Sequence, residues 1–136
     1  MAKQVFQGWE FPFAKTPAPG ERSLRLIASA ETNGYDKATV LLVHLPPLGT
    51  TGLHTHPDSD EIIFVNGRGE GSVAGEKSKL EVDSIIIAPK GVEHECRNTS
   101  ETESLKLYCV FIPPMKLSPT LQTIVQPTKE YLAKRK

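Results

Sequence analysis

The sequence predicts an all-β fold in which many short strands close on one another, and three observations support this prediction. Segments rich in β-branched or alternating apolar residues recur at close spacing between residues 23 and 112. Glycine, proline and Asn-Gly punctuate them, as is typical of turns. No convincing helical pattern occurs before residue 127. Together these features indicate a closed all-β architecture.

The first twenty residues are expected to form an arm. They carry the aromatic residues Phe6, Trp9, Phe11 and Phe13 and lead into the proline-rich run 16–20. Aromatic side chains on an irregular segment are stabilised by covering apolar surface. We expect them to pack on the outside of their own domain, and exchange with a second subunit is the alternative.

Strands are then expected over residues 23–29, 37–45, 61–65, 70–74, 78–82, 84–88, a segment starting near His94, and 105–112. A turn is expected at residues 33–34, and residues 75–77 are expected to close a hairpin. The apolar run 84–88 is expected to be buried on both faces.

Beyond Pro113 and Pro114 the chain changes character. Residues 128–134 are expected to form one or two helical turns, with Thr128 as the N-cap.

Residues 54–61, His-Thr-His-Pro-Asp-Ser-Asp-Glu, contain two histidines two positions apart. On an extended strand such residues point to the same face, so His54 and His56 can present two imidazoles side by side. Asp60 and Glu61 follow closely. Imidazole plus carboxylate is the donor set of borderline divalent metals.

A second histidine segment spans residues 89–98. Pro89 and Gly91 turn the chain tightly, and His94 then lies near the start of a short strand. From there it can reach the first histidine pair.

Together the two segments resemble the cupin family, because residues 54–61 follow its HxH-x(3,4)-E pattern and residues 89–98 its P-x-G-x2-H-x3-N pattern. The resemblance covers residues 37–112. It implies a double-stranded β-helix, or jelly-roll, barrel with an N-terminal arm and a short C-terminal extension. It also implies a homodimer and one divalent metal, whose ligands by position would be His54, His56, Glu61 and His94.

Two departures from the family pattern bear on this transfer. The family usually has six residues between the glutamate and the next glycine, and counting to Gly67 gives five from Glu61 but six from Asp60. Asp60 is therefore a rival ligand, and apolar residues on both faces of the following strand leave the choice open. Asp83 stands where the second motif opens with glycine, and aspartate tolerates the left-handed conformation of such a turn.

Composition excludes several classes of protein. A chain of 136 residues with 38% hydrophobic residues is expected to form a single domain, 1–136, around one core. The sixteen Lys and Arg residues balance sixteen Asp and Glu residues, so no basic stripe predicts nucleic-acid binding. No apolar run approaches the roughly 20 residues that span a bilayer, and no signal core follows Met1, so we expect a cytoplasmic protein without a membrane partner.

Three further side chains can be placed by strand alternation. Cys96 lies two residues beyond His94 and Cys109 shares a face with apolar neighbours, so both are expected to point inward as reduced thiols. They are weak catalytic candidates, and inert packing is the favoured interpretation. His44 lies outside both motifs and is expected to be a core or rim histidine. The tyrosine base of resembling lyases is replaced by Ile63.

Three imidazoles and one carboxylate around a divalent ion leave a net charge of about +1, which favours an anionic or oxygen-chelating ligand. The ligand set does not choose among iron, manganese, nickel, cobalt, copper and zinc. Our first hypothesis is a metal-dependent enzyme acting on a small carboxylate- or hydroxyl-bearing molecule, of dioxygenase, decarboxylase, isomerase or lyase type. The second is a non-catalytic module that binds a small molecule, a sugar or a metal, and the third is a purely structural barrel.

Overall fold

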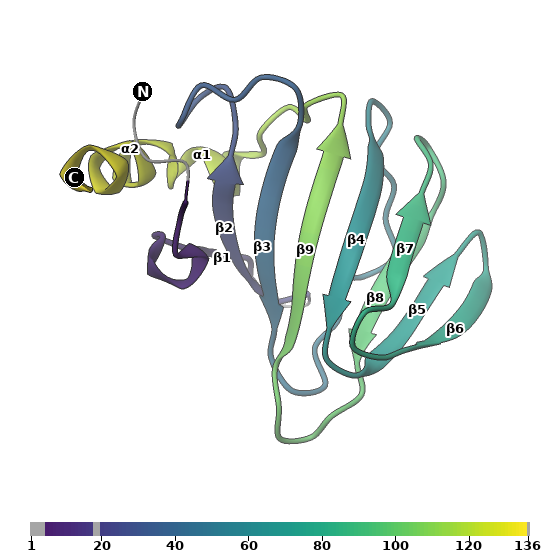
Figure 1. Ribbon diagram of the computed structural model, residues 1–136. Helices are drawn as coiled ribbons and strands as arrows, with labels where there is room; N and C mark the ends of the chain where they lie inside the picture. The colour runs from purple at the N-terminus through teal and green to yellow at the C-terminus, as the bar shows by residue number, and fades with distance from the viewer. Residues whose placement is uncertain (1–4, 18–19, 136) are drawn as a thin grey trace.

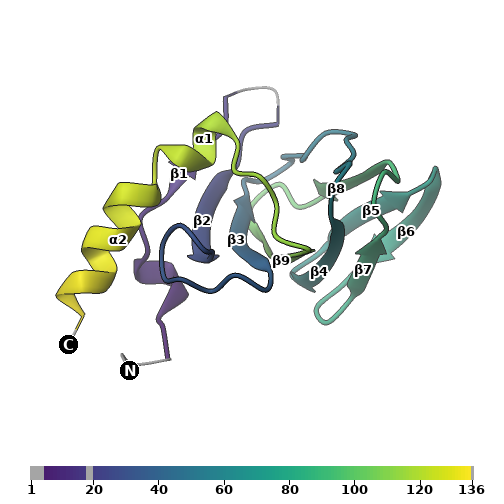
Figure 2. The ribbon, with the colours of Figure 1, turned by 90° about the horizontal axis from the view of Figure 1, so that it is seen from above.

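The computed structural model describes residues 5–17 and 20–135 as two antiparallel β-sheets that face each other (Figures 1 and 2). The strands of the six-stranded sheet are, in spatial order, β1 (Ala14–Lys15), β2 (Ser23–Ala28), β3 (Thr39–Leu45), β9 (Leu105–Ile112), β4 (Asp60–Asn66) and β7 (Ile85–Ala88). Those of the three-stranded sheet are β6 (Glu76–Leu80), β5 (Gly69–Val73) and β8 (His94–Asn98). This is the predicted double-stranded β-helix fold.

The core lies between the two sheets because each strand turns alternate side chains inward. β9 shows the pattern most clearly, with Leu105, Leu107, Cys109 and Phe111 all buried. Leu80 and Cys96 of the smaller sheet belong to the same hydrophobic cluster. Strand alternation therefore predicted the interior face of β9 and of β8.

Buried Asn98 fastens the end of β8 to neighbouring segments. Its side-chain amide donates to the carbonyls of Leu45, Pro46 and Glu103 at 3.2, 3.0 and 2.8 Å, and its side-chain oxygen accepts from the backbone N–H of Ser100 at 2.9 Å. One side chain thus satisfies several backbone groups that would be costly to bury without a partner. This explains why the second motif ends in asparagine.

The N-terminal arm packs partly on its own chain. Phe11 is 2% exposed and contacts Phe6 and Tyr131, with ring centroids 5.8 and 5.0 Å away. Trp9 and Phe13 remain 69% and 53% exposed. The expected packing is confirmed for Phe11, whereas Trp9 and Phe13 leave most of their apolar surface uncovered.

The C-terminal extension contains two helices, α1 (Pro119–Gln122) and α2 (Val125–Lys134), which lie beside β1 and β2 in Figure 1. The Ser118 hydroxyl caps α1 by accepting from the Leu121 N–H at 3.2 Å. The predicted cap Thr128 is wrong, because it lies fully buried inside α2. α2 begins earlier because Pro127 falls in its first turn, where a missing N–H costs no hydrogen bond. Within the described ranges, no helix is long and apolar enough to cross a membrane.

Two strand predictions also need correction. Ala74 and Gly75, at φ 51° and 83°, form a two-residue turn that pairs Val73 with Glu76, so β6 starts before residue 78. β7 is an edge strand with one uncovered face, which leaves Ile85 and Ile87 57% and 64% exposed instead of buried.

Candidate metal centre

The two histidine segments are joined by their backbones. The N–H of His54 donates to the carbonyl of His94 at 3.0 Å, and the N–H of His94 donates to that of His54 at 2.9 Å. The Gly91 N–H donates to the His56 carbonyl at 2.9 Å. These bonds extend the smaller sheet beyond β8 and hold the histidines of both motifs next to each other.

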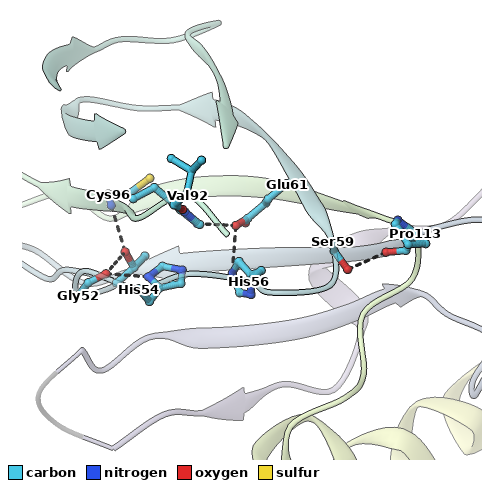
Figure 3. Close-up of polar contacts among 10 residues, drawn as sticks. Gly52, His54, His56, Ser59, Glu61, Val92, Cys96 and Pro113 are labelled. Carbon is cyan, nitrogen blue, oxygen red and sulfur yellow. Dashed lines mark hydrogen bonds and ion pairs between the residues drawn. The ribbon is translucent and has the colours of Figure 1, made fainter. Parts of the chain in front are cut away.

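Glu61 projects from β4 toward these histidines. It is 4% exposed, and its Oε1 lies 2.8 Å from Nε2 of His94. The same oxygen lies 3.2 Å from Nε2 of His56 (Figure 3). One potential ligand atom from each of His54, His56, Glu61 and His94 lies within 4.8 Å of the others. Residues distant in sequence thus form one compact group of nitrogen and oxygen donors.

Backbone carbonyls orient two of the imidazoles. Nδ1 of His54 lies 2.7 Å from the Gly52 carbonyl, and Nδ1 of His94 lies 3.0 Å from the Val92 carbonyl. A carbonyl can only accept, so each Nδ1 carries the proton and donates. This turns Nε2 of each ring toward the cluster, and when that atom carries no proton it can bind a metal.

Glu61 and His94 shift each other's pKa values toward the charged forms. Burial raises the pKa of Glu61, but hydrogen bonds from His56 and His94 outweigh it and lower the pKa to about 2. Burial lowers the pKa of His94, but the hydrogen bonds to Glu61 and to the Val92 carbonyl outweigh it, so that pKa is raised. Burial lowers the pKa of His54. Glu61 is thus an anion at neutral pH, as a metal-binding carboxylate must be.

Asp60 lies outside this cluster. It is exposed on the opposite face of β4, and its Oδ1 accepts a hydrogen bond from the Lys90 backbone N–H at 2.8 Å. Of the two rival carboxylates, the structure brings Glu61 to the histidines. Three imidazoles and this one carboxylate are a donor set that fits a divalent transition metal.

The cluster forms one wall of a partly open cavity of about 170 Å³. The other walls are mainly apolar and include Leu24, Leu41, Val43, Ile63, Leu107, Phe111, Met115 and Leu121. Pockets for drug-sized ligands usually have volumes of roughly 300–1,000 Å³. The cavity therefore fits a smaller molecule.

Both cysteines line this cavity, as strand alternation predicted. Burial raises the pKa of Cys96 to about 12 and raises that of Cys109 well above its ordinary value. Because the thiolate is the reactive form, protonated thiols at these positions support the interpretation as packing groups.

Arg22 also lines the cavity, although no motif includes it. The signal that would have found it is strand alternation, since Arg22 shares its parity with buried Leu24 and Leu26. His44, in contrast, is not part of the cluster. It lies on the other face of β3, with Nδ1 3.4 Å from Arg25.

Comparison with known proteins agrees with this geometry. A family model described as the cupin domain matches residues 41–111, more than half of the chain. The chain belongs to the cupin family. All four residues of the cluster lie within the matched cupin segment.

Solved structures share the fold of this cupin over most of its length. A predicted oxalate decarboxylase from Thermotoga maritima superimposes with a TM-score of 0.73 and 24% identity, covering 81% of this chain and 99% of the other. KdgF from Halomonas sp. superimposes with a TM-score of 0.65 and 21% identity, covering 80% of this chain and 94% of the other. An RmlC-like cupin from Shewanella frigidimarina superimposes with a TM-score of 0.66 and 13% identity, covering 82% of this chain and 92% of the other. A search of curated proteins found no match.

Proposed function

We propose that this cupin is a metal-dependent enzyme that acts on a small carboxylate- or hydroxyl-bearing molecule. The observation that carries the proposal is the His54, His56, Glu61 and His94 cluster in the wall of a partly open, mainly apolar cavity. A structural barrel needs neither a buried glutamate nor three histidines around it, because burying such groups costs free energy.

The four residues of the cluster would hold the ion. When bound, a divalent transition metal supplies Lewis-acid polarisation, activation of water or reaction with dioxygen. The chain itself contributes the surroundings of the reaction. Phe111 packs edge-on against His56 with ring centroids 4.9 Å apart, and the apolar walls limit the contact of the donor atoms with water. In such surroundings electrostatic contacts to a substrate are stronger than in water.

Turnover by the metal-loaded protein tests this proposal. Separate preparations loaded with iron, manganese, nickel, cobalt, copper or zinc would be incubated with small acids, sugars and catechols, with and without oxygen. We expect at least one substrate to be consumed, and we expect Glu61→Gln protein to lack that activity. Consumption of no substrate by any preparation would contradict the enzyme proposal.

One observation favours a second candidate, a non-catalytic binding cupin. Apart from the cluster, the ionisable groups that line the cavity are Arg22, Cys96 and Cys109, and the pKa of each thiol is raised. None of these is a suitable general base at neutral pH. Thermal stabilisation of the protein by a small molecule that is not consumed would support this candidate.

We also propose that the cupin forms a homodimer through the outer face of β4, β7 and β9, which lie side by side in Figure 1. Its exposed apolar or aromatic side chains are Phe64, Ile85, Ile87, Tyr108 and Ile112, with exposed Asp60 and Asn66 at opposite ends of β4. Phe64 of β4 is paired with Ile85 of β7 on one side and with Tyr108 of β9 on the other, so the apolar side chains of the three strands are neighbours. An apolar patch of this kind can pack against its own copy, and such patches mark interfaces.

An acidic side chain on this face is expected to separate the subunits. Ile87→Glu should reduce the mass measured by light scattering from that of a dimer to that of a monomer, because each interface would bury two uncompensated carboxylates. Val82→Glu changes an exposed valine outside the face and should leave the dimer intact. A native protein that is monomeric at micromolar concentration would refute the proposal.

A further inference from the structure

We infer that Arg22 anchors the carboxylate of a small bifunctional ligand whose other oxygen donor faces the His54, His56, Glu61 and His94 cluster. This inference rests on the proposed function, because it assigns a ligand class to the same cavity. It adds a second recognition group, from a part of the chain that precedes both histidine motifs.

The backbone fixes where Arg22 points. Its N–H donates to Oγ1 of Thr16 at 2.9 Å, and its carbonyl accepts from the Thr16 N–H at 3.0 Å. Leu24 and Leu26, which follow at alternate positions of β2, are 5% and 0% exposed and face the interior. Arg22 therefore enters the cavity from the start of an inward-facing row of side chains.

The guanidinium has few partners in this apolar setting. Nη1 donates to the Gly20 carbonyl at 3.0 Å. Within residues 5–17 and 20–135, no carboxylate lies within 4.0 Å of it to form an ion pair. Burial outweighs the attraction of the Glu61 carboxylate and lowers the pKa of Arg22 below its ordinary value. Arginine remains charged in proteins, so the cavity contains a cation without a close counter-ion.

A carboxylate is the chemical group that fits this environment. The planar guanidinium binds carboxylates with two parallel hydrogen bonds, and such a pair is stronger in partly buried surroundings than in water. The cluster forms another part of the wall of the same cavity, whose volume is about 170 Å³. A ligand that contacts both the Arg22 guanidinium and the cluster must be short. It needs a hydroxyl, a carbonyl or a second carboxylate a few bonds away from the carboxylate that Arg22 binds. Glycolate, pyruvate, oxalate and malonate represent this class.

Calorimetric titration of these four acids into native and variant protein tests the inference. Arg22→Gln removes the charge at similar length and should weaken binding about 10- to 100-fold, as expected for a lost charged hydrogen bond. Arg22→Lys keeps the positive charge, so its affinity for the acids should fall less than that of Arg22→Gln. Arg97→Gln, a matched change at an exposed arginine of β8, should bind as the native protein does. Ethylene glycol, which has no carboxylate, should bind all four proteins alike.

Metal content, measured on the same samples, separates this inference from the proposed function. We expect all variants at Arg22 and Arg97 to retain as much metal as the native protein. Equal carboxylate affinity in native and Arg22→Gln protein, or no carboxylate binding by the native protein, would overturn the inference. Binding that depends on Arg22 without consumption of any acid would support it while removing the enzyme proposal.

Discussion

Alanine at His56 or His94 is expected to leave the purified protein almost free of metal. Each change removes one of the nitrogen donors that converge with Glu61. Loss of even an outer-shell partner of a metal ligand typically reduces affinity 10- to 100-fold, so loss of a ligand should cost more than about 100-fold. Elemental analysis of protein purified without added metal measures the content, and competition with a chelator measures the affinity.

The fourth histidine and the rival acid provide matched controls. His44→Ala removes an imidazole from the other face of β3, and Asp60→Ala removes a carboxylate from the exposed face of β4. Both variants should keep the native metal content, whereas Glu61→Ala should not. A metal content that falls in Asp60→Ala but not in Glu61→Ala would reverse the assignment of the carboxylate.

Alanine at Gly69 is expected to destabilise the fold strongly, although it adds only one methyl group. A Cβ atom at this position would lie 2.2 Å from the backbone carbonyl oxygen of Arg97, on the neighbouring strand β8. Backbone cannot rotate away as a side chain does, so β5 and β8 would have to separate where Gly69 pairs with Asn98. We expect a loss of about 3 kcal/mol in the free energy of unfolding, which lowers the melting temperature by roughly 10 °C.

Gly71→Ala is the control for this prediction, because it lies two residues further along β5. There a Cβ atom would meet only the ends of the Ile86 and Leu80 side chains, both at 3.2 Å. Flexible side-chain ends can shift, so the cost should be about 1 kcal/mol or less. Urea denaturation of the native protein and both variants gives the comparison. Equal midpoints for the two variants would show that the close approach at Gly69 does not limit stability.

Much of the fold was predictable because local patterns agree with the tertiary structure. β9 spans the predicted residues 105–112, and β2, β3 and β4 begin and end within two residues of the predicted limits. The patterns failed where the decisive information is non-local. An apolar run such as 84–88 has the same sequence pattern at the centre of a sheet and at its edge, so the exposure of Ile85 and Ile87 depends on which strands pair.

The candidate site likewise combines features that local sequence patterns predict with features that depend on how the strands pair. The spacing of the histidines indicated three donors that the structure brings together, but it could not separate Asp60 from Glu61. That choice depends on the face that β4 turns inward, and both faces of the strand are largely apolar. Arg22 escaped notice because one arginine near a proline-rich segment carries no motif. Its place in the cavity wall is evident only from the folded structure, in which the start of β2 borders the cavity.

The walls of the cavity come from two kinds of segment. The family match, residues 41–111, contains every residue of the donor cluster. Arg22 and Leu24 precede that segment, whereas Met115, Ser118 and Leu121 follow it and complete the same cavity. Substitutions in these flanking segments can therefore reshape the binding space without touching the donors. Under the proposed function, these flanking segments would determine which small molecule is bound, whereas the residues of the matched segment would hold the metal.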